Sequence, residues 1–223
     1  IDSGLLTFVP DSNENGSSYN TFTFTVNDGT TDSASSYTMT VNVTAVNDAP
    51  TASNNTVTTN EDTDHTFAAS EFGFTDVDGD SLDHVSIETL PSNGTLLLSG
   101  SAVSAGDQIS AANISNLVFR PAANANGASY DTFTFTVNDG TTDSASSYTM
   151  TVDVTAVNDA PTASNNTVTT NEDTDHTFAA SEFGFTDVDG DSLDHVSIET
   201  LPSNGTLLLS GVAISAGDQI STA

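Results

Sequence analysis

The chain has 223 residues, in which 31 Asp and Glu residues stand against one basic side chain, Arg120, so that the formal net charge is −30. This balance excludes binding to nucleic acid or anionic lipid, because both require clustered Lys and Arg. The lack of Cys excludes thiol catalysis, disulfides and thiolate metal sites, and no apolar run approaches the roughly 20 residues of a membrane span.

A repeat of 111 residues organises the sequence. The segment TFTFTVNDG begins at Thr21 and again at Thr132, and VNDAP begins at Val46 and again at Val157. Each of these pairs has the same offset, so the chain contains tandem copies of one structural unit.

The repeat is out of frame with the chain ends. Residues 49–160 form one complete repeat, whereas 1–48 match only the C-terminal part of a repeat and 161–223 only the N-terminal part. The simplest interpretation is a window of two periods on a longer array. In the alternative, split repeats of neighbouring chains complete each other by strand addition. A head-to-tail homopolymer would follow, because such a contact does not close on itself.

Strands are predicted along the complete repeat, because apolar and polar residues alternate and no helical period occurs. In chain order the candidates are 56–59, 65–69, 84–90, 94–98, 117–119, 130–137 and 148–154. Clusters of Asn, Gly, Pro and Asp separate them. About seven short strands in roughly 110 residues predict an all-β fold, an antiparallel sandwich of immunoglobulin-like architecture with almost no helix.

Acidic residues crowd into one stretch of the repeat. In DVDGD, residues 76–80, three carboxylates alternate beside Gly79, which permits a backbone conformation that a side chain would oppose. Their repulsion favours a bound cation, and Ca²⁺ accepts six to eight hard oxygen ligands. The spacing differs from the EF-hand loop, so further ligands must be distant in sequence. The alternative is a solvated turn that only maintains solubility.

Four motifs carry a resemblance to a known family: VNDAP at 46–50, NEDT at 60–63, DVDGD at 76–80 and FTFTVNDG at 133–140. Together they resemble motifs of cadherins, and above all the cadherin-like, VCBS-type tandem repeats of large bacterial surface proteins and adhesins. The resemblance covers essentially the whole chain. It implies tandem immunoglobulin- or cadherin-like sandwiches outside the cell, which calcium at the junctions between repeats holds in an extended array.

The resemblance also implies the calcium ligands of each junction. Those of the first junction are Asn47, Asp48, Asp76, Asp78 and Asp139, with Asp28 as the earlier equivalent of Asp139. Those of the second are Asn158, Asp159, Glu61, Asp187 and Asp189. Further candidates, by repetition or proximity, are Asp62, Asp80, Glu172, Asp173 and Asp191. The acidic DRE-type motif of cadherins has no counterpart here.

The sequence contains no clear pattern of a histidine metal site or of an enzyme. The histidines lack the HxH and HExxH spacings of metal sites and are interpreted as strand residues. No GxSxG elbow or other nucleophile context occurs, so no enzyme activity is expected. Sequons such as the one at Asn15 would permit surface glycans. A self-assembling filament subunit and a carbohydrate-binding module are the alternative functions.

Overall fold

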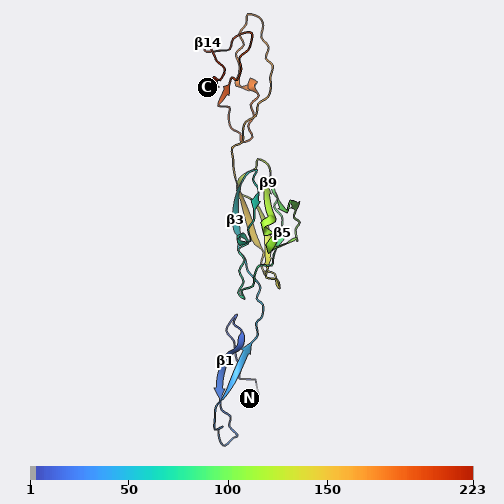
Figure 1. Ribbon diagram of the computed structural model, residues 1–223, viewed down its shortest axis with the longest axis vertical. Coiled ribbons are helices and arrows are strands. Elements are labelled where there is room, and N and C mark those ends of the chain that lie inside the picture. The colour runs from blue at the N-terminus through green and yellow to red at the C-terminus, as the bar shows by residue number, and fades with distance from the viewer. Residues whose placement is uncertain (1–3, 223) are drawn as a thin grey trace. The chain divides into compact units, whose positions relative to one another are not determined.

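The structure is a computed structural model, which describes residues 4–222 (Figure 1). Residues 1–3 and 223, the outer ends of the two predicted partial repeats, lie outside the described residues. The chain divides into two compact units, residues 1–155 and 156–223. The division at residues 48 and 160 stays a prediction from the repeat.

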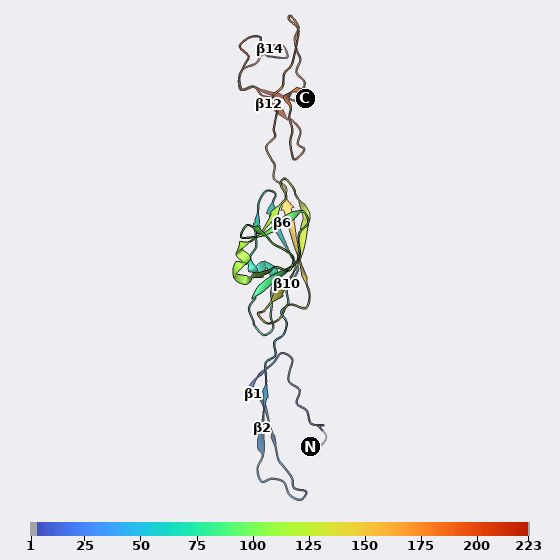
Figure 2. The ribbon, with the colours of Figure 1, turned by 90° about the vertical axis from the view of Figure 1, so that its right-hand side faces the viewer.

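The complete repeat folds as a two-layer sandwich (Figure 2). One sheet contains, in spatial order, β3 (Asn55–Asn60), β11 (Tyr148–Thr155), β10 (Gly127–Asn138), β5 (His84–Thr89) and β8 (Gln108–Ser110). The other contains β4 (His65–Thr66), β9 (Leu117–Pro121), β6 (Gly94–Leu98) and β7 (Ser101–Ala102). This architecture confirms the predicted all-β, immunoglobulin-like class.

The core of the sandwich follows from the alternation in the sequence. Phe133, Phe135 and Val137 of β10 are fully buried, and each is followed by a polar residue that is only partly buried. Phe67 and Phe72 close the core with edge-on ring contacts, whose centroids lie 5.6 Å from Phe133 and 4.9 Å from Phe135 respectively. Burial of the one apolar face of a strand therefore fixes both the pairing register of the strand and the face that it turns toward the core.

The structure corrects two details. The predicted strand 65–69 ends at Thr66, because a 3₁₀ helix, η1 (Ala69–Phe72), follows, and Gly73 with φ 59° caps this helix. Two more short 3₁₀ helices, η2 (Ala111–Asn116) and η3 (Ala180–Phe183), complete the small helical content, which agrees with the prediction of almost no helix. The sheets are not wholly antiparallel, since β3 pairs in parallel with β11.

The N-terminal segment is a hairpin of β1 (Gly16–Phe24) and β2 (Tyr37–Val43). It repeats the pairing of β10 with β11: Phe22 faces Met39 as Phe133 faces Met150. The surroundings differ, because Phe22 is 42% exposed and Phe133 is fully buried. The local pairing is therefore encoded in the hairpin, whereas burial depends on the rest of the sandwich.

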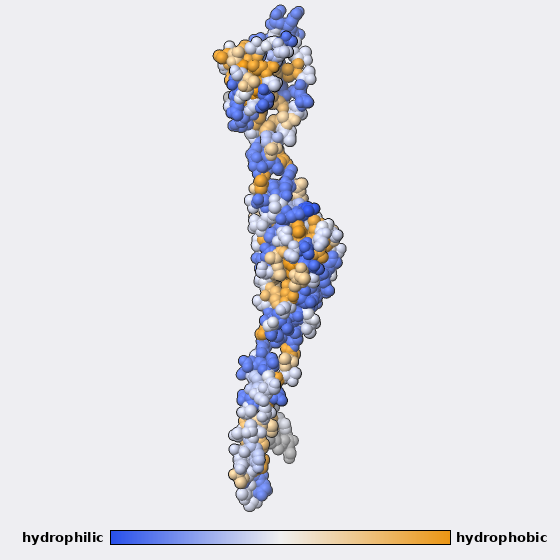
Figure 3. Space-filling view, viewed as in Figure 1, coloured by the Kyte–Doolittle hydropathy of each residue, from blue (hydrophilic) through white to orange (hydrophobic). Residues whose placement is uncertain are grey.

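The C-terminal unit has the sequence of the first part of the repeat but contains fewer and shorter strands. Its strands pair in two small ladders, β12 (His195–Ser197) with β15 (Gln219–Ser221) and β13 (Leu208–Leu209) with β14 (Val212–Ala213). Residues 166–171, equivalent to β3, form no strand. Hydrophobic side chains gather on the surface of this unit (Figure 3).

Candidate metal centre

The link that enters the complete repeat is tied to two loops of that repeat. The side-chain amide of Asn47 donates to Asp139 Oδ2 at 2.9 Å and to the carbonyl oxygen of Asp48 at 3.0 Å. The backbone N–H of Asp48 donates to Asp78 Oδ2 at 2.7 Å. The structure thus brings together link and loop residues that the sequence separates by up to 92 positions.

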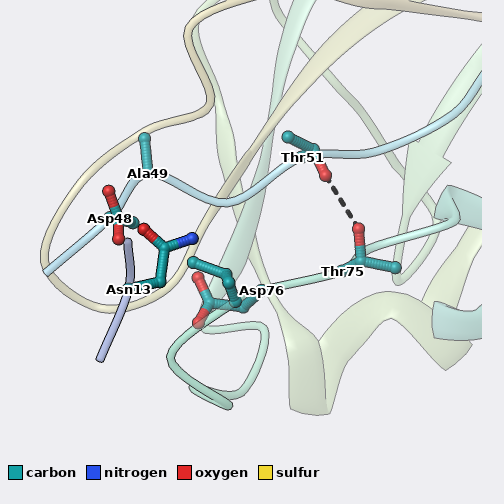
Figure 4. A pocket seen from close by; sticks show the side chains of 7 residues that line it. Asn13, Asp48, Ala49, Thr51, Thr75 and Asp76 are labelled. Atoms are coloured by element: carbon teal, nitrogen blue, oxygen red, sulfur yellow. Dashed lines mark hydrogen bonds between the residues drawn. The ribbon is translucent and has the colours of Figure 1, made fainter. Parts of the chain in front are cut away.

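The DVDGD loop is shaped by its own first carboxylate. Asp76 Oδ1 accepts from the backbone N–H of Asp78 at 2.8 Å and of Asp80 at 3.1 Å, and Gly79 has φ 85°, as expected for a turn glycine. The loop is anchored beside the link, because Thr51 and Thr75 exchange two backbone hydrogen bonds of 2.8 Å. Their hydroxyls lie 2.7 Å apart (Figure 4).

Three carboxylates converge in this loop. One oxygen from each of Asp76, Asp78 and Asp80 lies within 4.8 Å of the others, and no other such group occurs in residues 4–222. Asp76 Oδ2 is buried and accepts no hydrogen bond. Opposite ligands of Ca²⁺ are about 4.6–5.2 Å apart, since each oxygen lies 2.3–2.6 Å from the ion. The oxygen donors and their spacing therefore fit Ca²⁺.

The carboxylate of Asp139 is held ionised by its neighbours. The Asn47 amide, together with the backbone N–H groups of Thr142 and Thr141, lowers its pKa. The bonds from Thr141 and Thr142 go to Oδ1 and measure 2.6 and 2.7 Å. Asp28, the earlier equivalent, accepts the same backbone bonds from Thr30 and Thr31 but is exposed.

The second link repeats this local geometry. Asp159 N–H donates to Asp189 Oδ2 at 2.7 Å, and the Asn158 amide donates to the Asp159 carbonyl oxygen at 2.9 Å. Asp187 Oδ1 accepts from Asp189 and Asp191, as Asp76 does in the first loop. The link and the acidic loop therefore adopt this arrangement also in the C-terminal unit, which has fewer strands than the complete repeat.

Two predicted ligands lie where the chain leaves the complete repeat. Glu61 is 3% exposed, its N–H donates to the carbonyl oxygen of Thr155 at 2.9 Å, and its Oε2 accepts from Asn126 at 3.3 Å. Asp62 Oδ1 accepts from Asn124 N–H at 3.0 Å. The structure does not join either residue to the DVDGD loop at the entry end. Their equivalents Glu172 and Asp173 lie on an exposed turn.

The histidines lie on strands or equivalent segments, as predicted. His65 Nε2 is 3.3 Å from Glu71 Oε2, and His84 Nδ1 is 2.8 Å from Asp83 Oδ2. Both rings are mostly buried, and neither belongs to the carboxylate group of the DVDGD loop. The two histidines therefore belong to the sandwich and not to the candidate metal centre.

Two structural carboxylates were missed by the sequence analysis. Asp131, 5% exposed, accepts the backbone N–H groups of Ser92, Asn93, Gly94 and Thr132. Burial raises its pKa, but these four donors outweigh the burial and lower it. The available signal was an acidic residue two positions before Phe133, on the inward face of the strand. Asp64 forms a two-pronged ion pair with Arg120, at 2.8 and 2.7 Å.

The fold and this site define a class of protein: an all-β, immunoglobulin-like structural module whose entry link is bound to an acidic loop. The family model described as bacterial Ig domain matches residues 47–155 and 158–218. The chain therefore belongs to the bacterial Ig domain family, a structural, non-enzymatic fold family typical of surface proteins. Neither the curated proteins nor the solved structures gave a match. No helix in residues 4–222 is long and apolar enough to cross a membrane.

Proposed function

We propose that this chain is a calcium-rigidified spacer of a bacterial surface protein or adhesin. The observation that carries the proposal is Asp76 Oδ2, a buried carboxylate oxygen without a hydrogen-bond donor, in a cluster of three carboxylates beside the entry link. Buried polar atoms are almost always paired, so an unpaired carboxylate oxygen among other carboxylates favours a cation.

The ligands would come from the link and from the two loops of the complete repeat that the link contacts. Asp76, Asp78 and Asp80 would hold Ca²⁺ from the loop, and Asp48, Asn47 and Asp139 supply further oxygens from the link and from the turn after β10. When bound, the ion supplies positive charge that neutralises the facing carboxylates. The Asn47 and Asp48 hydrogen bonds already orient the link, so little further ordering is required.

Rigid links are what a spacer needs. A link that is held by the DVDGD loop and by the turn after β10 would fix the angle between neighbouring sandwiches. The repeats would then project a distal function away from the cell. The same junction recurs at Asn158 and Asp159. This tandem repetition supports the proposal that the repeats serve to extend the array. Membership of the bacterial Ig domain family supports a surface location.

The calcium site is tested by thermal melting of the complete repeat within the 223-residue chain, first in excess Ca²⁺ and then with chelator. Asp76→Asn keeps an acceptor for the amides of Asp78 and Asp80 but removes the charge, so it should lose most of the calcium-dependent rise in Tm. In chelator the variant should melt at or above the unchanged protein, because one charge has left a repulsive cluster.

Glu88→Gln is the matched control, because it removes the same charge from the exposed face of β5. It should keep the full calcium-dependent rise. A rise in Asp76→Asn equal to that of the unchanged protein would place calcium elsewhere. Small-angle scattering on the same samples should show a stiffer particle in calcium, and no change in stiffness would contradict the spacer role.

A further inference from the structure

One buried nitrogen of the complete repeat has no hydrogen-bond partner. It is Nε2 of His84, and no other side-chain atom of this kind occurs in residues 4–222 outside the two links and the DVDGD loops. Buried polar atoms are almost always paired with the protein, with water or with an ion. The Nε2 atom of His84 therefore indicates a place where the protein accepts a ligand from outside.

The other ring nitrogen of His84 determines the state of Nε2. Nδ1 lies 2.8 Å from Asp83 Oδ2, which is a hydrogen-bond distance. A carboxylate only accepts hydrogen bonds, so Nδ1 carries the proton, and in the neutral ring Nε2 keeps a lone pair. Histidines that bind metals almost always donate their other N–H to such a partner, which fixes the tautomer and the ring orientation.

A second carboxylate lies beside this lone pair. Asp143 Oδ1 is 3.9 Å from His84 Nε2. Two groups of negative charge density at this distance repel each other, and a cation between them would attract both. The sum of a Zn–N and a Zn–O bond is about 4.0–4.3 Å, so one ion can contact both atoms. A tetrahedral angle at the ion would need the two atoms to approach each other by about 0.5 Å.

Backbone pairing brings these two side chains together. His84 is opposite Asn138 in the ladder of β5 with β10, and Asn138 forms a bridge with Asp143 in the turn after β10. The Asn138 amide also donates to Asp143 Oδ1 at 2.7 Å. A carboxylate oxygen has two lone pairs, so Oδ1 can keep this hydrogen bond and still bind an ion. The pair is therefore preorganised by the sheet.

An ion can reach the site from the solvent. The side chain of His84 is only 14% exposed, whereas that of Asp143 is 58% exposed. An ion that binds Asp143 at the surface would reach Nε2 through a small movement of the Asp143 side chain. The same exposure leaves room for water molecules in the remaining coordination positions.

We propose that His84 Nε2 and Asp143 bind a divalent transition metal ion, with Zn²⁺ as the ion to be tested, and that Asp83 holds the imidazole in place. Imidazole nitrogen is a ligand of Zn²⁺, Ni²⁺ and Cu²⁺, whereas Ca²⁺ takes oxygen ligands. With two protein ligands, the site should bind more weakly than structural zinc sites, which have four. This proposal does not rest on the calcium site.

The proposed ion would stabilise the turn that receives the entry link. Asp139 of this turn accepts the Asn47 amide, and Asp143 follows four residues later. Zn²⁺ on His84 and Asp143 would join β5 to the same turn. Because the ion would bind only the folded arrangement, it should raise the stability of the complete repeat.

The other histidines have different surroundings. Nε2 of His65 and Nε2 of His176 lie 3.3 and 3.2 Å from a glutamate oxygen, so each already has an acidic partner. The side chain of His195, in the C-terminal unit, is 36% exposed. These residues supply matched controls for His84.

Thermal melting of the 223-residue chain tests the site. The chain is first melted in excess Ca²⁺, which competes for exposed carboxylates, and then with a small molar excess of ZnCl₂ added. Zn²⁺ should raise the Tm of the complete repeat, and His84→Gln should lose most of this rise. Asp143→Asn should lose it too, although it keeps an oxygen acceptor for the Asn138 amide and changes an exposed side chain.

Two control variants separate this site from the rest of the chain. His195→Gln removes a histidine outside the complete repeat and should keep the full zinc-dependent rise. Asp76→Asn should also keep it, because Asp76 belongs to the DVDGD loop. The zinc result is therefore independent of whether calcium binds there. An equal rise in His84→Gln and in the unchanged protein would overturn the proposal.

Nitrogen NMR of the histidine rings identifies the ligand atom without relying on stability. In a chain with ¹⁵N-labelled histidine, Zn²⁺ should shift the Nε2 signal of His84 much more than its Nδ1 signal. Comparison with the His84→Gln spectrum assigns both signals. A zinc-dependent shift confined to other histidines, or no shift at a molar excess of Zn²⁺, would overturn the proposal.

Discussion

The side-chain amide of Asn47 donates a hydrogen bond to the carboxylate of Asp139, 92 residues later in the chain. This bond joins the link before the sandwich to the turn after β10. Hydrogen bonds of the protein therefore contribute to the direction of the link.

Asn47→Ala should lower the Tm of the complete repeat by a few degrees in chelator, because Asp139 loses a donor that lowers its pKa. Asn158→Ala is the control, since Asn158 occupies the same place in the second link and its side-chain amide donates to the carbonyl oxygen of Asp159 within that link. Differential scanning calorimetry measures both. Equal effects of the two variants would mean that the Asn47 bond does not stabilise the sandwich.

Asp131→Asn should destabilise the complete repeat by about 1.5–3 kcal/mol at pH 7, since hydrogen bonds to a charged acceptor are strong and Asn offers one acceptor oxygen in place of two. The folded pKa of Asp131 lies below its unfolded value of about 3.9. Its contribution is therefore present above that value and is lost as the pH falls through the folded pKa. Denaturant unfolding from pH 7 to 2.5 should show the two proteins converging below about pH 4, and a constant difference would contradict this account.

Gly94→Ala should destabilise the sandwich by about 1–3 kcal/mol. A Cβ at this position would overlap the ring of Phe119 and lie 2.9 Å from the Arg120 carbonyl oxygen, so β6 and β9 would have to separate. Gly94→Ala combined with Phe119→Leu should cost less than the sum of the two single variants, because the smaller side chain makes room for the new Cβ. Additive costs in a urea titration would show that the backbone contact dominates.

Phe133→Ala should cost about 3–5 kcal/mol of unfolding free energy, because Phe133 is fully buried in the core. Phe22→Ala, the same change at the equivalent position of the N-terminal hairpin, should leave the stability of the complete repeat unchanged, because Phe22 is 42% exposed. Denaturant unfolding of the two variants compares their costs. A similar cost at both sites would mean that the hairpin already packs against a core.

The sequence predicted the parts of the fold that depend on alternation. β10 and β11 were recognisable because each has one apolar face, and that face is the one buried in the core. β7 and β8 are only two and three residues long, too short for a period to appear. η1 could not be distinguished from a strand, because its boundaries depend on a tertiary contact of Phe72 and on Gly73 in the left-handed conformation.

The candidate site was predictable only in part for a similar reason. The DVDGD loop is local, so its shape follows from Asp76 and Gly79 in the sequence itself. The meeting of Asn47 with Asp139 is not local, and it was expected only through the resemblance to cadherin-like repeats. Asp131 was overlooked because its partners lie in a loop about 38 residues earlier, which no period in the sequence connects to β10.

The parallel pairing of β3 with β11 joins the first long strand of the complete repeat to its last. A force that pulls on both ends of this repeat therefore acts along these two strands in opposite directions. Their hydrogen bonds, from Met150 opposite Asn55 to Thr155 opposite Asn60, would have to break together in shear and could not open one at a time. The same pairing that closes the sheet thus makes the repeat resistant to stretching.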